Sequence, residues 1–170
     1  MTSTMDPIIF QTDPPFSEVD HLEGCCIFTL GYIAAKAVGV QFSTQNMQTW
    51  LQQGRAQTDS LGTGMVIGAN DYLQDPQALI DLMCGGHKLV YKGLVDATYQ
   101  PQTGEFCQDY LFNPDSVTAN NPDGFHHFVI GWTGPGQDEY DPICYGPGQG
   151  SNTASAPNTY IESKRLYALV

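Results

Sequence analysis

The sequence predicts an α+β fold, with helices in the first half of the chain and strands in the second. Between residues 24 and 84, apolar side chains recur at the three- and four-residue steps of a helix face. From Lys88 onward, apolar residues alternate with polar ones, which is typical of strands. The chain shows no internal repeat and no linker, so we expect one domain spanning residues 1–170.

Three helices are predicted from apolar periodicity and capping residues. They are residues 24–38, a segment that Ser43 or Thr44 caps and Gly54 ends, and a segment that follows Asp75-Pro76 and closes at Gly85-Gly86. Residues 54–71 are rich in glycine and lack periodicity, so we expect a loop there.

Strands are predicted near residues 8–10, 89–91, 110–112, 125–132, 139–143 and 159–170. The segment 125–132 gives the strongest signal. Its pleat places His127 and Val129 on one face and His126, Phe128, Ile130 and Trp132 on the other. Residues 146–158 are rich in Gly, Ser, Asn and Pro, which predicts a surface loop.

The composition argues against several classes of partner. The chain has 18 acidic and 6 basic residues and a net charge of −12. We therefore expect no nucleic-acid partner, because phosphate binding needs clustered cations. Association with an anionic membrane surface is disfavoured for the same reason. The apolar fraction of 41% predicts a globular chain rather than a disordered one.

Targeting signals and cofactor motifs are not found in the sequence. The N-terminal segment lacks the basic start and apolar run of a signal peptide, and no apolar stretch reaches the roughly 18 residues of a membrane span. Five cysteines without a CxxC pair argue against a disulfide framework and a zinc ribbon. We therefore expect a cytoplasmic protein in a reducing compartment, without a metal or another cofactor.

Cys25 is the candidate nucleophile. It stands at the start of the first predicted helix, where the partial positive charge of unpaired N–H groups favours the thiolate, the nucleophilic form of cysteine. Gly24 lets the backbone approach closely just before the thiol. The alternative is that Cys25 and Cys26 are two small apolar residues in a buried helix, which is a common role of free cysteines.

His127 and Asp141 are the candidate partners of Cys25. Cysteine-dependent hydrolysis needs an imidazole to carry a proton and a carboxylate or amide to hold the ring. We prefer His127 to His126, because the apolar residues of the opposite strand face can then pack in the core. The two histidines point to opposite faces and so do not chelate one metal ion. For Asp141, the alternative is a turn residue before Pro142.

These residues carry a resemblance to papain-like cysteine peptidases. The segment Gly24-Cys25-Cys26-Ile27-Phe28-Thr29 resembles their helix start, where the Cys is followed at short range by an aromatic residue and a Ser or Thr. His127-Phe128-Val129-Ile130-Gly131 and Asp141-Pro142 resemble segments of double-glycine leader peptidases and of related phage and bacterial cysteine peptidase-like domains. Residues 160–167 resemble the C-terminal strand of phage-encoded members.

The resemblance implies a helical half carrying Cys25, packed against an antiparallel sheet that carries His127 and Asp141. It also implies that Gln11 donates its amide to an oxyanion hole, with an ordinary surface glutamine as the alternative. The implied activity is that of a peptidase or amidase, which cleaves a peptide or isopeptide bond of a peptide or protein substrate through a thioester. A peptidoglycan hydrolase and an inactive, virion-associated binding module are the alternatives on the same scaffold.

Overall fold

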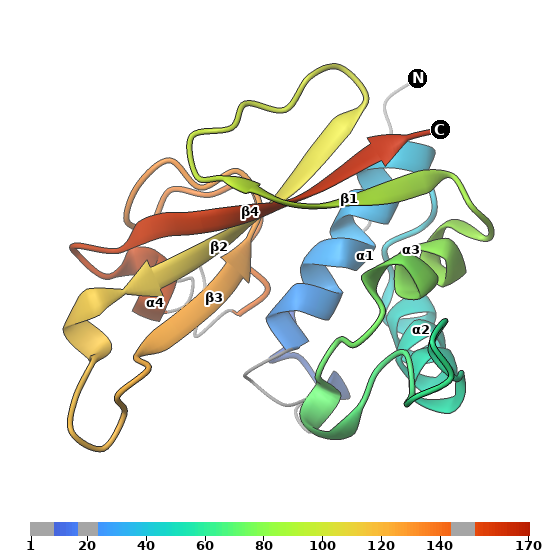
Figure 1. Cartoon of the computed structure of the whole chain (residues 1–170), viewed down its shortest axis with the longest axis horizontal. Coiled ribbons are helices and arrows are strands. Elements are labelled where there is room, and N and C mark those ends of the chain that lie inside the picture. The colour runs from blue at the N-terminus through green and yellow to red at the C-terminus, as the bar shows by residue number, and fades with distance from the viewer. Residues whose placement is uncertain (1–8, 17–23, 144–151) are drawn as a thin grey trace.

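The computed structural model describes residues 9–16, 24–143 and 152–170 (Figure 1). It confirms the predicted fold class, because N-terminal helices with buried Cys25 and Cys26 pack on a C-terminal four-stranded antiparallel sheet, as in papain-like folds. In chain order the elements are α1 (Gly24–Val38), α2 (Thr44–Ala56), the short 3-10 helix η2 (Ala69–Asp71), α3 (Pro76–Cys84), β1 (Leu89–Asp96), β2 (Glu105–Asn113), the short 3-10 helix η3 (Pro114–Ser116), β3 (Phe125–Val129), α4 (Asn152–Ser155) and β4 (Tyr160–Leu169).

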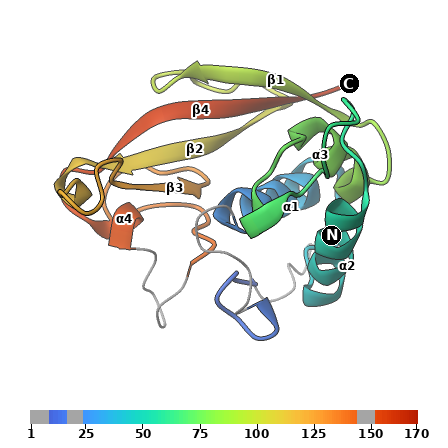
Figure 2. The ribbon, with the colours of Figure 1, turned by 60° about the horizontal axis from the view of Figure 1, so that its bottom comes forward.

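The sheet has the strand order β1-β4-β2-β3, and every neighbouring pair is antiparallel. The last strand of the chain, β4, therefore lies inside the sheet, between β1 and β2. β3 lies at one edge, where His127 is opposite Leu111 of β2. In Figure 2 the four strands form one twisted layer, with the helices on one side of it.

α1 is the central helix of the core. All residues from Gly24 to Ala34 are buried, and the first charged residue of the helix is Lys36. A helix that is apolar all round can be covered on every side. α1 contacts α3 as well as β2 and β3, and Figure 1 shows it between the sheet and the other two long helices. Its N-terminal end, with Cys25, is thereby fixed within the core.

The structure confirms three predicted elements, each of which begins and ends at or next to the predicted residues. α1 spans the predicted residues, and β4 occupies the predicted C-terminal strand. α3 begins directly after Asp75, close to the predicted start, and the Asp75 side chain caps it by accepting a hydrogen bond from the Ala78 N–H. It ends at Gly85, which adopts the left-handed conformation with φ of 65°.

β1 and β2 extend beyond the apolar segments predicted at 89–91 and 110–112. β1 continues to Asp96 through a register shift near Gly93, whose φ of +95° suits a bulge. β2 starts at Glu105 and includes polar residues. Both strands pair with β4, so backbone hydrogen bonds to a shared neighbour extend them where the side-chain pattern is weak.

Gly54 does not end α2, contrary to the prediction. The helix continues to Ala56, and Gln57 caps it. A Cβ at position 54 would lie 2.6 Å from Ile67 Cδ1, and the Ile67 N–H donates to the Gly54 carbonyl at 2.9 Å. The glycine is therefore needed for close approach of a neighbouring segment. A glycine needed for close packing and a glycine that ends a helix cannot be distinguished from the sequence alone.

β3 is shorter than the strand predicted at 125–132. Its pairing with β2 ends at Val129. Gly131 has a φ of +65°, and the Trp132 N–H donates to Asp109 Oδ2 at 2.9 Å instead of to a strand. Trp132 consequently leaves the strand face on which it was predicted and packs beside a different apolar cluster.

The strand predicted at 139–143 is reduced to one bridge. The Ile130 N–H donates to the Tyr140 carbonyl at 2.9 Å, and these two residues form an isolated antiparallel pair. Immediately afterwards, Asp141 accepts a hydrogen bond from the Ile143 N–H at 2.9 Å. This local side-chain contact forms a turn where a ladder was expected.

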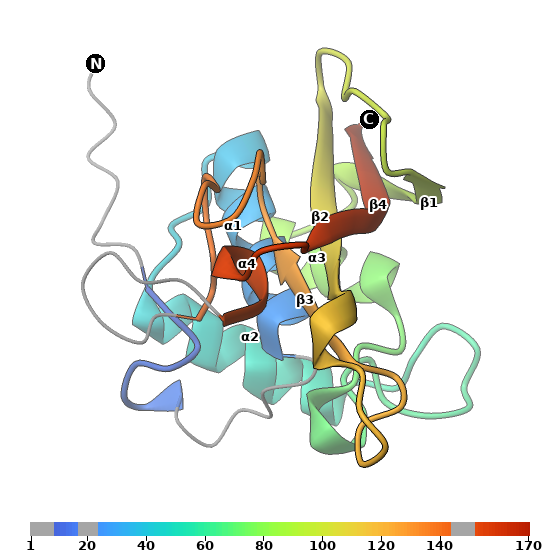
Figure 3. The same ribbon diagram turned by 90° about the vertical axis from the view of Figure 1, so that its left-hand side faces the viewer.

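The predicted surface loop at 146–158 contains the short helix α4. Ala154 is buried with Leu111 and Val129, and Figure 3 shows α4 beside β3. Residues 144–151 lie outside the described ranges. At the other end of the chain, Ile9 and Phe10 are not in the strand predicted at 8–10, and residue 8 lies outside the described ranges. Among the described residues, no helix is long and apolar enough to cross a membrane.

The contact between Gly54 and Ile67 predicts the effect of a small substitution. Gly54→Ala should lower the free energy of unfolding by about 1–3 kcal/mol, because the new methyl group overlaps a residue that is itself buried. Urea denaturation measures this change, with the exposed Gln53→Ala as the matched helix variant. Equal or greater stability of Gly54→Ala would show that Ile67 moves aside at no cost.

Candidate active site

Cys25 is the second residue of α1, and its side chain is 1% exposed. The first turn is held by Thr29, whose hydroxyl donates to the Cys25 carbonyl at 2.8 Å and to the Cys26 carbonyl at 3.0 Å. The thiol thus lies where the unpaired N–H groups of the helix produce a positive potential.

His127 lies in the middle of β3 and is 3% exposed. Its Nε2 lies 2.6 Å from Asp141 Oδ1, and the imidazole also forms a hydrogen bond with the Cys25 side chain. The structure therefore brings together the three candidate residues, from α1, β3 and the segment after the Tyr140 bridge. The order of contacts is thiol, imidazole and carboxylate.

Asp141 is positioned by its neighbour Tyr140. The Tyr140 ring stacks on Tyr32 of α1, with centroids 4.7 Å apart and planes at 10°, and its hydroxyl donates to the Ile9 carbonyl at 2.8 Å. Its backbone forms the bridge with Ile130. One aromatic residue thus joins the Asp141 segment to α1, to the end of β3 and to the N-terminal segment.

The electrostatics of this group favour a charged imidazole. Burial lowers the pKa of His127, but hydrogen bonds to Asp141 and Cys25 and the negative charges of these two groups outweigh burial and raise it to about 10. The imidazolium is then the form present at neutral pH. The favourable charge on His127 is lost as the pH rises through about 10.

The other histidines take no part in this arrangement. His126 faces away from His127, stacks on Tyr110 and Phe112, and lies 3.4 Å from Glu162 Oε2. The pleat predicted from the sequence therefore places the two histidines on opposite sides as expected. His87 is exposed and pairs with Asp81, and His21 lies outside the described residues.

Gln11 is fully buried beside the Asp141 segment. Its backbone N–H donates to the Pro142 carbonyl at 2.8 Å. Neither the nitrogen nor the oxygen of its side-chain amide has a hydrogen-bond partner in the described structure. Buried amides without partners are rare because they lose their hydration without replacement. The surface position that was the alternative for Gln11 is wrong, and its unused amide belongs to a residue whose backbone contacts Pro142, directly after Asp141.

A second network, which the sequence did not predict, holds the helix start. Buried Gln108 of β2 donates to the Cys26 carbonyl at 2.8 Å and to Thr29 Oγ1 at 2.7 Å, while Tyr167 donates to its oxygen at 3.0 Å. Arg165 Nη1 lies 2.9 Å from Cys26 Sγ. Cys26 is thus a contact between α1 and the sheet, next to the thiol that faces His127.

The remaining cysteines differ from Cys25. Burial raises the pKa of both Cys84 and Cys107 to about 11, and Cys144 lies outside the described residues. In the described part of the chain, no three His, Cys, Asp or Glu side chains gather as a metal site.

Comparisons of this chain with family models, curated proteins and solved structures find no match.

The Gln108 network predicts a loss of stability on substitution. Gln108→Leu has a similar volume but leaves the buried Tyr167 hydroxyl without its acceptor, which should lower the free energy of unfolding by about 1–3 kcal/mol. Urea denaturation tests this, with Gln52→Leu on the exposed side of α2 as the control. Unchanged stability in Gln108→Leu would mean that the network does not anchor α1.

Proposed function

We propose that the chain is a papain-like cysteine hydrolase, a peptidase or amidase that cleaves a peptide or isopeptide bond. One observation carries the proposal: the buried His127 imidazole hydrogen-bonds both the Cys25 side chain and the Asp141 carboxylate. A nucleophile, a base and an orienting carboxylate in this order are what acyl transfer by a cysteine requires. The motifs that resemble papain-like peptidases support the same conclusion.

In the first half-reaction, the Cys25 thiolate attacks the carbonyl carbon of the scissile bond. The His127 imidazolium gives its proton to the leaving nitrogen, the C–N bond breaks, and the amine departs. The product on the enzyme is a thioester between Cys25 and the acyl group. Asp141 holds the ring in place and stabilises its positive charge before the proton is transferred.

In the second half-reaction, neutral His127 takes a proton from water. The resulting hydroxide attacks the thioester, and the C–S bond breaks. The carboxylic acid leaves, and the thiolate and imidazolium are restored. No redox step and no external group are needed, because one proton moves between His127, the leaving amine and water.

The developing oxyanion needs hydrogen-bond donors. We assign this role to the Gln11 side-chain amide, together with the backbone N–H of Cys25 at the helix start. The support for this assignment is that Gln11 is buried next to Pro142 with its amide unused. A transition-state oxygen would supply the missing acceptor.

The hydrolase proposal and the alternative of an inactive binding module make different predictions about access to the Cys25 thiol. Cys25 is 1% exposed, so a substrate reaches it only when the structure opens around the start of α1. In a binding module on the same scaffold, that opening would not be needed and the thiol would stay closed. The reactivity of Cys25 in the folded protein separates these two functions.

Site-resolved alkylation by iodoacetamide, followed by mass spectrometry from pH 5 to pH 11, tests the thiolate–imidazolium pair. We expect Cys25 of the folded protein to react at pH 6–7 roughly tenfold faster than an ordinary thiol, of which only about 3% is ionised at pH 7. Cys84 and Cys107 should stay slow until the pH approaches 11, since their raised pKa values keep them protonated.

The matched variants are His127→Ala and His126→Ala. The first should abolish the reactivity of Cys25 below pH 8, and the second should preserve it, because His126 contacts Tyr110 and Glu162 instead. If Cys25 reacts only on unfolding, or no faster than a free thiol, the hydrolase proposal fails and the binding module is favoured.

A pair of reagents tests the assignment of Gln11. Acylation of Cys25 by p-nitrophenyl acetate passes through an oxyanion, whereas alkylation by iodoacetamide does not. Gln11→Ala should slow acylation by roughly 100-fold or more while leaving alkylation nearly unchanged. The exposed Gln102→Ala is the control. Equal effects on both reactions would place Gln11 outside the oxyanion hole.

A further inference from the structure

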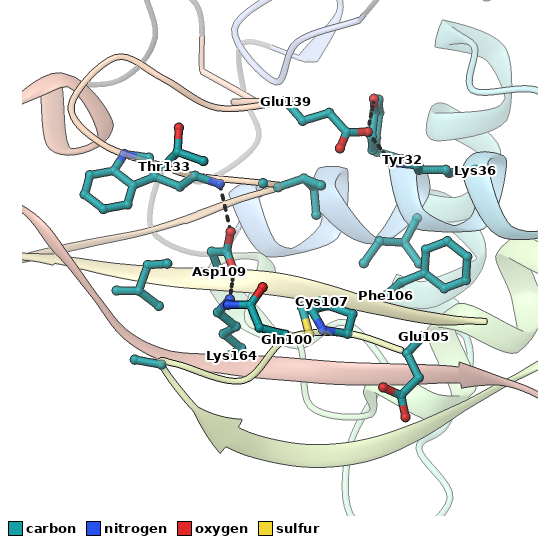
Figure 4. A pocket seen from close by; sticks show the side chains of 17 residues that line it. Tyr32, Lys36, Gln100, Glu105, Phe106, Cys107, Asp109, Thr133, Glu139 and Lys164 are labelled. Carbon is teal, nitrogen blue, oxygen red and sulfur yellow. Dashed lines mark hydrogen bonds and ion pairs between the residues drawn. The ribbon is translucent and has the colours of Figure 1, made fainter. Parts of the chain in front are cut away.

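A cavity lies away from the candidate triad. It has a volume of about 500 Å³ and is formed by the later turns of α1, by β2 and β4, and by the loops around residues 97–101 and 131–139 (Figure 4). Cys25, His127 and Asp141 do not line it. Its size is that of a site for a small molecule or a large side chain.

Asp109 is one of five charged residues that line this cavity, and it is paired with Lys164. It is 3% exposed, and its Oδ2 accepts a hydrogen bond from the Trp132 N–H at 2.9 Å. Its other oxygen, Oδ1, is buried and has no hydrogen bond within the described structure. Burial is also the main cause that raises the pKa of this carboxyl group. Asp109 therefore has an unused acceptor at the cavity wall.

Lys164 is the partner of Asp109 in this cavity. Its side chain is largely buried, and its Nζ donates to the Tyr99 carbonyl at 3.0 Å. Nζ lies 3.6 Å from Asp109 Oδ1, a separation longer than that of a well-formed hydrogen bond, so the two groups form a loose ion pair. An ammonium group has three N–H donors, so Lys164 has donors to spare. Figure 4 shows the Asp109 and Lys164 side chains next to each other in the cavity.

The other charged groups of the cavity already have close partners. Lys36 is paired with Glu139, and Glu105 accepts hydrogen bonds from the Tyr99 hydroxyl and the Gln102 N–H. The Asp109–Lys164 pair is different because its geometry leaves one acceptor and one donor unused. A buried pair with such open positions is costly in an empty site, and a ligand in the cavity that hydrogen-bonds both groups from one side would remove that cost.

The chemistry of that ligand follows from the pair and from its surroundings. The pair is neutral as a whole, and Ile33, Phe106, Ile130, Trp132 and Ile161 contribute apolar surface to the cavity. A charged ligand would lose its hydration and meet a like charge on one side. A primary amide has a carbonyl acceptor for Lys164 and an N–H donor for Asp109 on one planar, neutral group.

We propose that this cavity binds a neutral carboxamide, with the carbonyl oxygen at Lys164 and the N–H at Asp109. The carboxamide belongs to a small molecule or to a glutamine- or asparagine-like side chain. The apolar cavity wall accommodates the carbon chain attached to it. Binding of this group requires no reaction at Cys25, so the site is independent of the proposed hydrolase.

The test is titration of the ¹⁵N-labelled full-length protein with three probes that share a four-carbon chain: butanamide, butanoate and butylamine. The chain contains two tryptophans, Trp50 and Trp132, and their indole N–H signals report on the core and on this cavity. We expect butanamide to shift the Trp132 signals saturably and to leave Trp50 unchanged. Butanoate and butylamine should each bind at least roughly tenfold more weakly than butanamide.

Two variants alter the pair itself. In Asp109→Asn, the amide oxygen stays with the Trp132 N–H and an NH₂ group replaces Oδ1, so the ligand loses its acceptor. Lys164→Met removes the donor and keeps the chain length. Each should weaken butanamide binding roughly tenfold or more, while Lys88→Met at an exposed position should not change it.

A third variant leaves the pair intact in case the first two do not fold. Ala97 lines the cavity on the loop after β1, and Ala97→Phe should fill the cavity and abolish butanamide binding. Butylamine or butanoate as the best ligand would overturn the carboxamide assignment. The absence of saturable shifts at Trp132 with all three probes would overturn the site. Repetition in Cys25→Ala, with the same binding expected, separates this result from that of the hydrolase proposal.

Discussion

A buried imidazole needs partners from the protein, because water is not available to replace them. At 3% exposure, His127 receives two, the Cys25 thiol and the Asp141 carboxylate. Neither partner is near His127 in the sequence, so the hydrogen bonds exist only if a helix start, an edge strand and a loop meet at one point. The hydrogen bonds to His127 and the meeting of these three segments therefore depend on each other.

Other contacts of the fold hold the start of α1 and the Asp141 segment in place beside β3. α1 is buried over its first eleven residues, and the Gln108 and Arg165 contacts join its first turn to the sheet. On the opposite side, Tyr140 connects the Asp141 segment to α1 through ring stacking. Both supports use side chains, because the helix start and the Asp141 turn have no backbone ladder in common.

The sequence predicted the parts of the fold and site that depend on local patterns. The helix start at Cys25 and the separation of His127 from His126 follow from the helical period and the strand pleat, and both agree with the structure. The contacts that were missed join distant residues: Gln108 lies 82 residues from Cys26, and Arg165 lies 139 residues from it. Gly54 was misinterpreted for the same reason, since Ile67 explains it and no local pattern does.

The bridge between Ile130 and Tyr140 has one further consequence. The chain leaves the end of β3 and returns to the same point, where Tyr140 is held by its own contacts, so the intervening segment does not determine where Asp141 lies. Residues could be inserted or deleted there without moving the carboxylate relative to the imidazole. The distance along the chain from the histidine to the aspartate is therefore a weak guide to whether the two residues pair.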